Sequence, residues 1–263
     1  MTLLQGREAG PVQVVEAGPA VAVRGLTKRF GSGPNVLEDV SLDVAEGEFL
    51  CILGASGCGK STLLSLIADL DQPTSGSVEV LGGKPSLMFQ EPALFPWLTA
   101  EENVQLALRL KGVSKAARRE RAAELLALVR LKDAGKKRVH ELSGGMRQRV
   151  AMARALAQDS HVLLMDEPFA ALDAITRDVL HEELVRIRES QKLTVLFVTH
   201  NVREAVRLGD RVVLLSSRPG RVVKEYAVEI DQPRRIESPQ VASLSVAITE
   251  DLRTEIRRHG GQS

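Results

Sequence analysis

Residues 53–62, LGASGCGKST, combine types that could hold a phosphate group. The stretch matches G-x-x-x-x-G-K-[ST] from Gly54 to Ser61 and directly follows the apolar run 49–52. Glycines let successive backbone N–H groups face phosphate oxygens, and Lys60 adds a positive charge near the β- and γ-phosphates. We therefore predict a nucleoside triphosphate site made of Gly54, Ala55, Ser56, Gly57, Cys58, Gly59, Lys60, Ser61 and Thr62, with the Ser61 hydroxyl as a ligand of Mg²⁺.

An acidic pair follows a second apolar run. VLLMDE places Asp166 and Glu167 at the end of an expected strand. An aspartate there can hold Mg²⁺, and Glu167 points elsewhere because side chains alternate along a strand. Glu167 is then available to polarise an attacking water. Alone, such a pair is more often a surface turn, but its occurrence with the phosphate loop predicts a hydrolytic site.

The stretch LSGGMRQR, residues 142–149, is a third candidate site. Ser143 is typical of a helix N-cap, and Gly144 with Gly145 would leave exposed first-turn amides for an anion. An ordinary capped helix explains Ser143 but not two glycines, each of which weakens a helix by about 1 kcal/mol. The chain therefore carries two helix starts that suit an anion.

Together these motifs resemble the ATP-binding cassette (ABC) ATPases over about residues 21–217. The resemblance implies that the chain binds ATP and Mg²⁺, with Ser61, Gln90 and Asp166 around the metal ion. It also implies that a signature stretch closes over ATP held by a second subunit, so that two chains meet head to tail. The signature residues are Leu142, Ser143, Gly144, Gly145 and Gln148.

Other residues match that family one by one. Gln90, in MFQEPALFPW, resembles the glutamine that meets Mg²⁺ and the attacking water. His200, in VTH, resembles the switch histidine at the γ-phosphate, so Glu167, His200 and Gln90 are the expected catalytic residues. Asp173, in ALD, resembles the aspartate that communicates between the two sites. Phe30 resembles the aromatic residue that stacks on adenine, and packing in the core is the competing explanation.

One segment resembles the importer branch of the family. FQEPALFPWLTAEENV is similar to the part of nitrate, sulfonate and taurine importers that receives a coupling helix from a membrane subunit. Trp97, the only tryptophan, could anchor that helix or could belong to the core of the helical region. SSRPGRVV and DQPRRIESP resemble the same branch.

The resemblance implies an ATP-hydrolysing subunit that energises uptake of a small anionic solute of the nitrate, aliphatic sulfonate or taurine type. Expected partners are a second ATP-binding subunit, transmembrane permease subunits and a solute-binding protein. The expected location is the cytoplasmic face of the cell membrane, as a peripheral protein. No run of about 20 apolar residues occurs, so the chain is not expected to cross a bilayer itself.

A soluble ABC ATPase without transport, active in DNA repair or regulation, is the alternative. Such repair proteins separate two halves by a coiled coil or a zinc hook, and this sequence contains no CxxC. The net charge of +1 does not demand a nucleic-acid partner. Cys51 and Cys58 have neither disulfide nor metal spacing.

The elements that must position these residues alternate between apolar strands and amphipathic helices. This order predicts an α/β fold with a parallel sheet covered on both faces. A helical block, with expected helix starts at Thr99 and Ser114, interrupts it. The resemblance makes this a P-loop NTPase with a RecA-like α/β core, an N-terminal antiparallel β region and an inserted α-helical subdomain. The expected parts are a flexible tail at 1–20, an ATP-binding domain at 21–235 with its helical subdomain at about 95–160, and a C-terminal helix and tail at 236–263.

Overall fold

The computed structural model describes residues 18–260, and the tail expected at residues 1–20 lies almost entirely outside that range. The strands are β1 (Val21–Arg29), β2 (Asn35–Val44), β3 (Phe49–Leu53), β4 (Ser75–Val80), β5 (Ser86–Met88), β6 (Val162–Asp166), β7 (Thr194–Val198), β8 (Arg211–Leu215) and β9 (Val222–Ala227). The α-helices are α1 (Lys60–Ile67), α2 (Ala100–Leu110), α3 (Lys115–Leu128), α4 (Gly144–Leu156), α5 (Ala174–Gln191), α6 (Val202–Leu208) and α7 (Pro239–Gly260). Two 3₁₀ turns, η1 (Lys132–Ala134) and η2 (Val139–Glu141), join α3 to α4.

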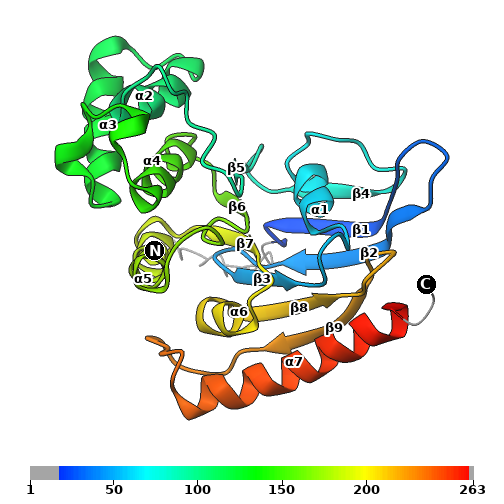
Figure 1. Cartoon of the computed structure of the whole chain (residues 1–263). Coiled ribbons are helices and arrows are strands. Elements are labelled where there is room, and N and C mark those ends of the chain that lie inside the picture. The colour runs from blue at the N-terminus through cyan, green and yellow to red at the C-terminus, as the bar shows by residue number, and fades with distance from the viewer. Residues whose placement is uncertain (1–17, 261–263) are drawn as a thin grey trace, which may run out of the picture.

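Three strands near the start of the chain form an antiparallel sheet in the order β2-β1-β4 (Figure 1). Val21 of β1 pairs with Val44 of β2 on one side and with Val80 of β4 on the other. Val21, Val23, Val40 and Val44 are buried, as the apolar–polar alternation of the sequence predicts. This antiparallel region is therefore the one expected from the sequence.

Six strands form a second sheet in the order β5-β6-β7-β3-β8-β9. The first five run parallel, as predicted, but β9 runs antiparallel to β8. The sequence predicts a further strand after β8 without fixing its direction, and the short turn at residues 216–221 makes the pair antiparallel, because a parallel pair needs a long crossover. Since β3, β6 and β7 are parallel, their carboxyl ends lie at one edge of the sheet.

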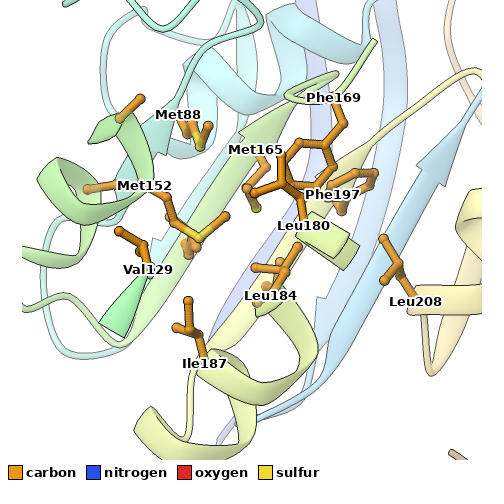
Figure 2. Packing of buried hydrophobic residues seen from close by; sticks show 14 of the residues in the cluster. Met88, Val129, Met152, Met165, Phe169, Leu180, Leu184, Ile187, Phe197 and Leu208 are labelled. Carbon is orange, nitrogen blue, oxygen red and sulfur yellow. The ribbon is translucent and has the colours of Figure 1, made fainter. Parts of the chain in front are cut away.

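The two faces of β3 pack against different layers. Phe49 and Cys51 belong to the apolar cluster with α4, α5 and α6, whereas Leu50 and Ile52 belong to the cluster with α1 and the antiparallel sheet. In the first cluster, Met165 of β6 and Phe197 of β7 gather with Phe169 and Leu180 (Figure 2). Phe197 lies with its ring centroid 5.9 Å from that of Phe169. Buried aromatic and aliphatic side chains thus pack around the last residues of both strands.

Helices α2, α3 and α4 form a block beside the sheets (Figure 1). α2 begins with the predicted capping box, in which Thr99 Oγ1 accepts from Glu102 N at 3.2 Å and Glu102 Oε2 accepts from Thr99 N at 2.8 Å. Ser114 caps α3 by accepting from Ala117 N at 3.4 Å. Local cap signals in the sequence therefore located both helix starts.

Candidate active site

The phosphate loop lies between β3 and α1, as the sequence predicts. Gly59 is the N-cap of α1 with φ 104°, and within the described structure no side chain caps this helix. The first-turn N–H groups of α1 are thus left for an anion. Lys60 is buried and its Nζ donates to Gly54 O and Ala55 O, both at 2.9 Å. The loop therefore combines a positive charge with a helix start that no side chain of residues 18–260 caps.

Ser61 and Asp166 meet at the base of this loop. A side-chain hydrogen bond joins them, and burial raises the pKa of Asp166 although this bond and the nearby Lys60 oppose the rise. Hydroxyl and carboxylate oxygens are ligands that Mg²⁺ prefers. Within residues 18–260 no group of three or more His, Cys, Asp and Glu side chains could hold a metal ion. The pair fits a Mg²⁺ ion whose remaining ligands are phosphate oxygens and water.

Glu167 and His200 lie side by side at the ends of neighbouring strands. His200 Nδ1 lies 2.8 Å from Glu167 Oε2, and Glu167 N donates to Val198 O at 3.0 Å. Glu167 has a positive φ of 42°, a conformation that costs a non-glycine residue on the order of 1 kcal/mol and that collects at functional sites. The two expected catalytic side chains are thus brought together.

The start of α4 differs in part from the expectation. Ser143 caps the helix, accepting from Met146 N at 3.3 Å, and both Ser143 and Gly144 are exposed. Gly145 is buried instead, and a Cβ there would lie 2.5 Å from Thr176 Cγ2 of α5. We expected two exposed first-turn glycines, and the structure exposes only Gly144, because α5 approaches closely at Gly145.

Known proteins share this arrangement. The family described as ABC transporter matches residues 37–170. The taurine import ATP-binding protein TauB of Mesorhizobium japonicum is 50% identical over 204 residues, which are 74% of this chain and 79% of that protein. The aliphatic sulfonates import ATP-binding protein SsuB of Bacillus subtilis is 43% identical over 235 residues, 84% of this chain and 91% of that protein. The chain belongs to the ATP-binding subunits of ABC importers.

Solved structures support the same family. A dimeric ATP-binding cassette in a post-hydrolysis state, bound to ADP and Pi, matches with a TM-score of 0.70 at 35% identity, over 80% of this chain and 100% of that chain. A second dimeric bacterial ABC transporter cassette matches with a TM-score of 0.71 over the same shares. The P-loop ABC ATPase fold is thereby confirmed, and the function is ATP hydrolysis coupled to transport rather than the non-transport alternative. Among the described helices, none is both long and apolar enough to cross a bilayer.

In this importer subunit, Gln148 is buried and bonded to the Gln90 segment within its own chain. Gln90 is exposed, but Gln148 is only 2% exposed and its Nε2 donates to Gln90 O at 3.0 Å. Leu142 is buried as well. Of the five signature residues, the structure therefore exposes Ser143 and Gly144 and uses Gln148 to attach α4 to the Gln90 loop.

Two other expected site residues are accessible. Phe30 is 53% exposed, with Lys28 Nζ 4.8 Å from the ring centroid, so the structure does not place it in the core. Asp173 is the exposed N-cap of α5, where its Oδ1 accepts from Thr176 N at 3.0 Å. That backbone hydrogen bond is the main cause that lowers the pKa of Asp173. Asp173 thus has a local structural role in addition to the expected communication between sites.

Two buried acidic residues that sequence reasoning missed support the site. Glu204 Oε1 lies 2.7 Å from His181 Nε2, and its other oxygen accepts from Thr199, the residue before His200. Glu183 Oε2 of α5 lies 3.0 Å from Arg149 Nε of α4, and Glu183 Oε1 lies 3.2 Å from Nε of Arg130, which follows α3. Burial raises the pKa of Glu183 and outweighs the opposing effect of the nearby arginines. Most of these contacts join segments far apart in the sequence, and the sequence does not indicate them. Only the position of Glu204, four residues after His200, is a local signal that this carboxylate lies near the site.

Proposed function

We propose that this subunit hydrolyses ATP in sites shared between two copies of the chain and so drives import of a small organic sulfonate. The observation that carries the shared site is the division of phosphate-binding features between two parts of the chain. The phosphate loop precedes α1, whereas the exposed Ser143 and Gly144 open α4. Within residues 18–260 no hydrogen bond or ion pair joins Ser143 or Gly144 to loop 54–61.

In this proposal the phosphate loop binds the triphosphate of one ATP molecule. The free first-turn amides of α1 and the Lys60 ammonium face the β- and γ-phosphates. Mg²⁺, held through Ser61 and Asp166, supplies charge neutralisation on the phosphate oxygens when it is bound. The exposed ring of Phe30 stacks on adenine. Binding thus uses residues that the fold already holds in place.

Hydrolysis is assigned to Glu167 and His200, which lie side by side at the ends of β6 and β7. Glu167 orients the attacking water and accepts its proton, and the contact with His200 Nδ1 keeps the carboxylate in place. The other ring nitrogen, Nε2, is then the one turned to the γ-phosphate. A second copy adds Ser143 and the amides of its α4 start to the same phosphate. Asp173 lies at the start of α5 and would sense the neighbouring site.

The aromatic loop after Gln90 is the proposed contact with the membrane permease. Trp97 is 66% exposed and Phe95 is 38% exposed, and their ring centroids lie 5.5 Å apart. Side chains of α2 and α4 fix the loop: Asn103 Oδ1 accepts from Phe95 N at 2.8 Å, and Arg154 donates to Ala93 O at 2.7 Å. An aromatic surface on a fixed loop suits a hydrophobic partner helix. The subunit would then sit at the cytoplasmic face of the membrane, without spanning it.

We propose that these functions are divided among three parts of the chain. Residues 21–235 form the ATP-binding domain, the helical subdomain at about 95–160 carries both Ser143 and the permease contact, and residues 236–263 contain the C-terminal helix. ATP would bring two copies together, the helical subdomains would move inward, and the permease would switch its open side.

A complementation experiment tests the shared site. Two separate variants are made: Lys60→Ala inactivates the phosphate loop, and Ser143→Arg blocks the signature. The homodimer of either variant is therefore expected to lack ATPase activity. In a mixed dimer, one loop and one signature remain intact and face each other. Mixing equal amounts should restore about a quarter of the wild-type rate, from half the dimers with one of two sites. Activity of either variant alone, or none after mixing, would contradict the proposal.

The solute is tested in proteoliposomes that contain the co-purified permease and its solute-binding protein. Relatives named for import of taurine and of aliphatic sulfonates support a sulfonate. Taurine or an alkanesulfonate should raise the ATPase rate, whereas nitrate should not. Stimulation by nitrate alone would reject the sulfonate assignment and leave the ATPase site untouched.

A further inference from the structure

The turn at residues 216–221, between β8 and β9, is a fixed structure. Ser216 Oγ donates to Pro219 O at 2.6 Å and accepts from Arg221 N at 2.9 Å, which closes the turn on itself. Gly220 N donates to Val36 O at 2.8 Å, and Gly220 O accepts from Glu38 N at 3.0 Å, both in β2. The turn is therefore anchored to the antiparallel sheet.

This turn contacts the phosphate loop at two carbonyl groups, those of Gly57 and Cys58. Arg218 Nε donates to Gly57 O at 2.9 Å. A Cβ at Gly220 would lie 2.3 Å from Cys58 O, so the turn backbone touches the loop at that carbonyl. A Cβ at Gly57 would lie 2.5 Å from the Arg218 guanidinium, so the guanidinium fills the space beside this glycine. Two consecutive loop carbonyls thus face the turn.

The direction of these carbonyls fixes the direction of the neighbouring amides. In a trans peptide the C=O and the following N–H point to opposite sides. The carbonyl of Gly57 faces Arg218, and the N–H of Cys58 accordingly points into the loop, where it donates to Ala55 O at 3.3 Å. The carbonyl of Cys58 faces the turn in the same way, which directs the N–H of Gly59 inward.

We propose that Arg218 is a positioning residue for ATP binding: by holding the Gly57 carbonyl it fixes the turn that Cys58 N closes on Ala55 O, so that the loop amides after Cys58 face the triphosphate. This inference rests on the proposed ATP site at residues 54–61. Arginine suits the task because its planar guanidinium can donate to a carbonyl and fill the space beside a glycine at once. An ordinary β-turn would need neither contact.

The chain contains its own reporter for the loop. Cys58 lies in the loop and Cys51 lies in β3, and both thiols are free and buried. Arg218→Ala should raise the rate of N-ethylmaleimide modification of Cys58 in nucleotide-free protein about tenfold and leave Cys51 unchanged. It should also raise the KM for ATP about fivefold with kcat unchanged, since a hydrogen bond from a charged group is lost. Arg218→Lys should restore part of both effects.

Arg221→Ala is the matched control, because Arg221 belongs to the same turn but pairs with Glu38 at 2.9 Å and not with the loop. It should leave both readouts at wild-type values. Wild-type behaviour of Arg218→Ala, while Lys60→Ala loses ATP binding, would overturn the positioning role alone. Faster modification of Cys51 together with Cys58 would indicate general loosening and would also overturn it. Retained ATP binding by Lys60→Ala would instead reject the ATP site, and Cys58 would still report on the loop.

Discussion

The two helix starts that suit an anion, at α1 and at α4, are built in different ways. α1 begins at a glycine N-cap without a capping side chain, and its loop is enclosed by β2, by the turn at 216–221 and by the buried Lys60. α4 begins at Ser143, which caps the helix itself and lies at the surface. One start needs a ligand to satisfy its amides, whereas the other is stable without one. The difference suggests that α1 binds nucleotide in either state of assembly and α4 contributes only when a second copy approaches.

The strongest test of this comparison is Lys60→Ala. The ammonium is the full positive charge inside the α1 loop, so ATP affinity should fall about 100-fold or more. Binding of a fluorescent ATP analogue measures the loss. Lys84→Ala is the control, because Lys84 is exposed and pairs with Asp69 at 3.0 Å, and it should bind like the wild type.

Glu167→Gln separates binding from chemistry at the same loop. The amide cannot accept a proton from water, so kcat should fall about 10²–10⁴-fold while ATP affinity is retained. Phosphate release and nucleotide binding, measured on the same preparation, check both parts. A kcat near the wild-type value would remove Glu167 from its catalytic role.

Arg154→Ala probes how α4 is attached to the rest of the chain. Arg154 donates to Ala93 O at 2.7 Å and to Pro92 O at 2.8 Å, and these bonds from a charged group should contribute about 1–3 kcal/mol. We expect lower stability in urea and faster hydrogen exchange in the aromatic loop. Arg109→Ala, at an exposed position of α2, should change neither quantity.

The smallest effect is expected at the α4 cap. Ser143→Ala and Ser114→Ala each remove a serine N-cap, of α4 and α3, and each should cost about 1 kcal/mol of stability. Only Ser143→Ala should also lower the ATPase rate, because in the proposed shared site only that serine meets the ATP of a second copy. An equal loss of activity in both variants would mean that the cap, and not the ligand contact, matters.

Local signals made much of this structure predictable. The glycine loop, the strand ending at Asp166 and the capping box at Thr99 each depend on neighbours within a few residues. A short strand such as β5, with three residues, is too brief to show periodicity. The sequence therefore predicts the phosphate loop and the strand that carries the acidic pair, whereas β5 gives no such signal.

Contacts between distant segments could not be predicted in the same way. Gln148 is buried against Gln90, and Gly145 has no side chain because α5 passes close by. Arg218 meets Gly57 across a long interval of sequence. In each case the residue type is explained by a partner that the fold supplies, and the sequence alone does not name that partner.

Helix α4 connects the segment after Gln90 with the signature serine. Gln148 and Arg154 attach residues 90–93 to the helix, and Ser143 lies at its N-terminus, about 16 Å from Arg154 at a rise of about 1.5 Å per residue. In the proposed assembly the helix would act as a lever arm that links the permease contact to the signature serine. A small tilt imposed by the membrane partner would swing the serine toward or away from the opposing nucleotide, and closure of the dimer would push the membrane partner back through the same rod.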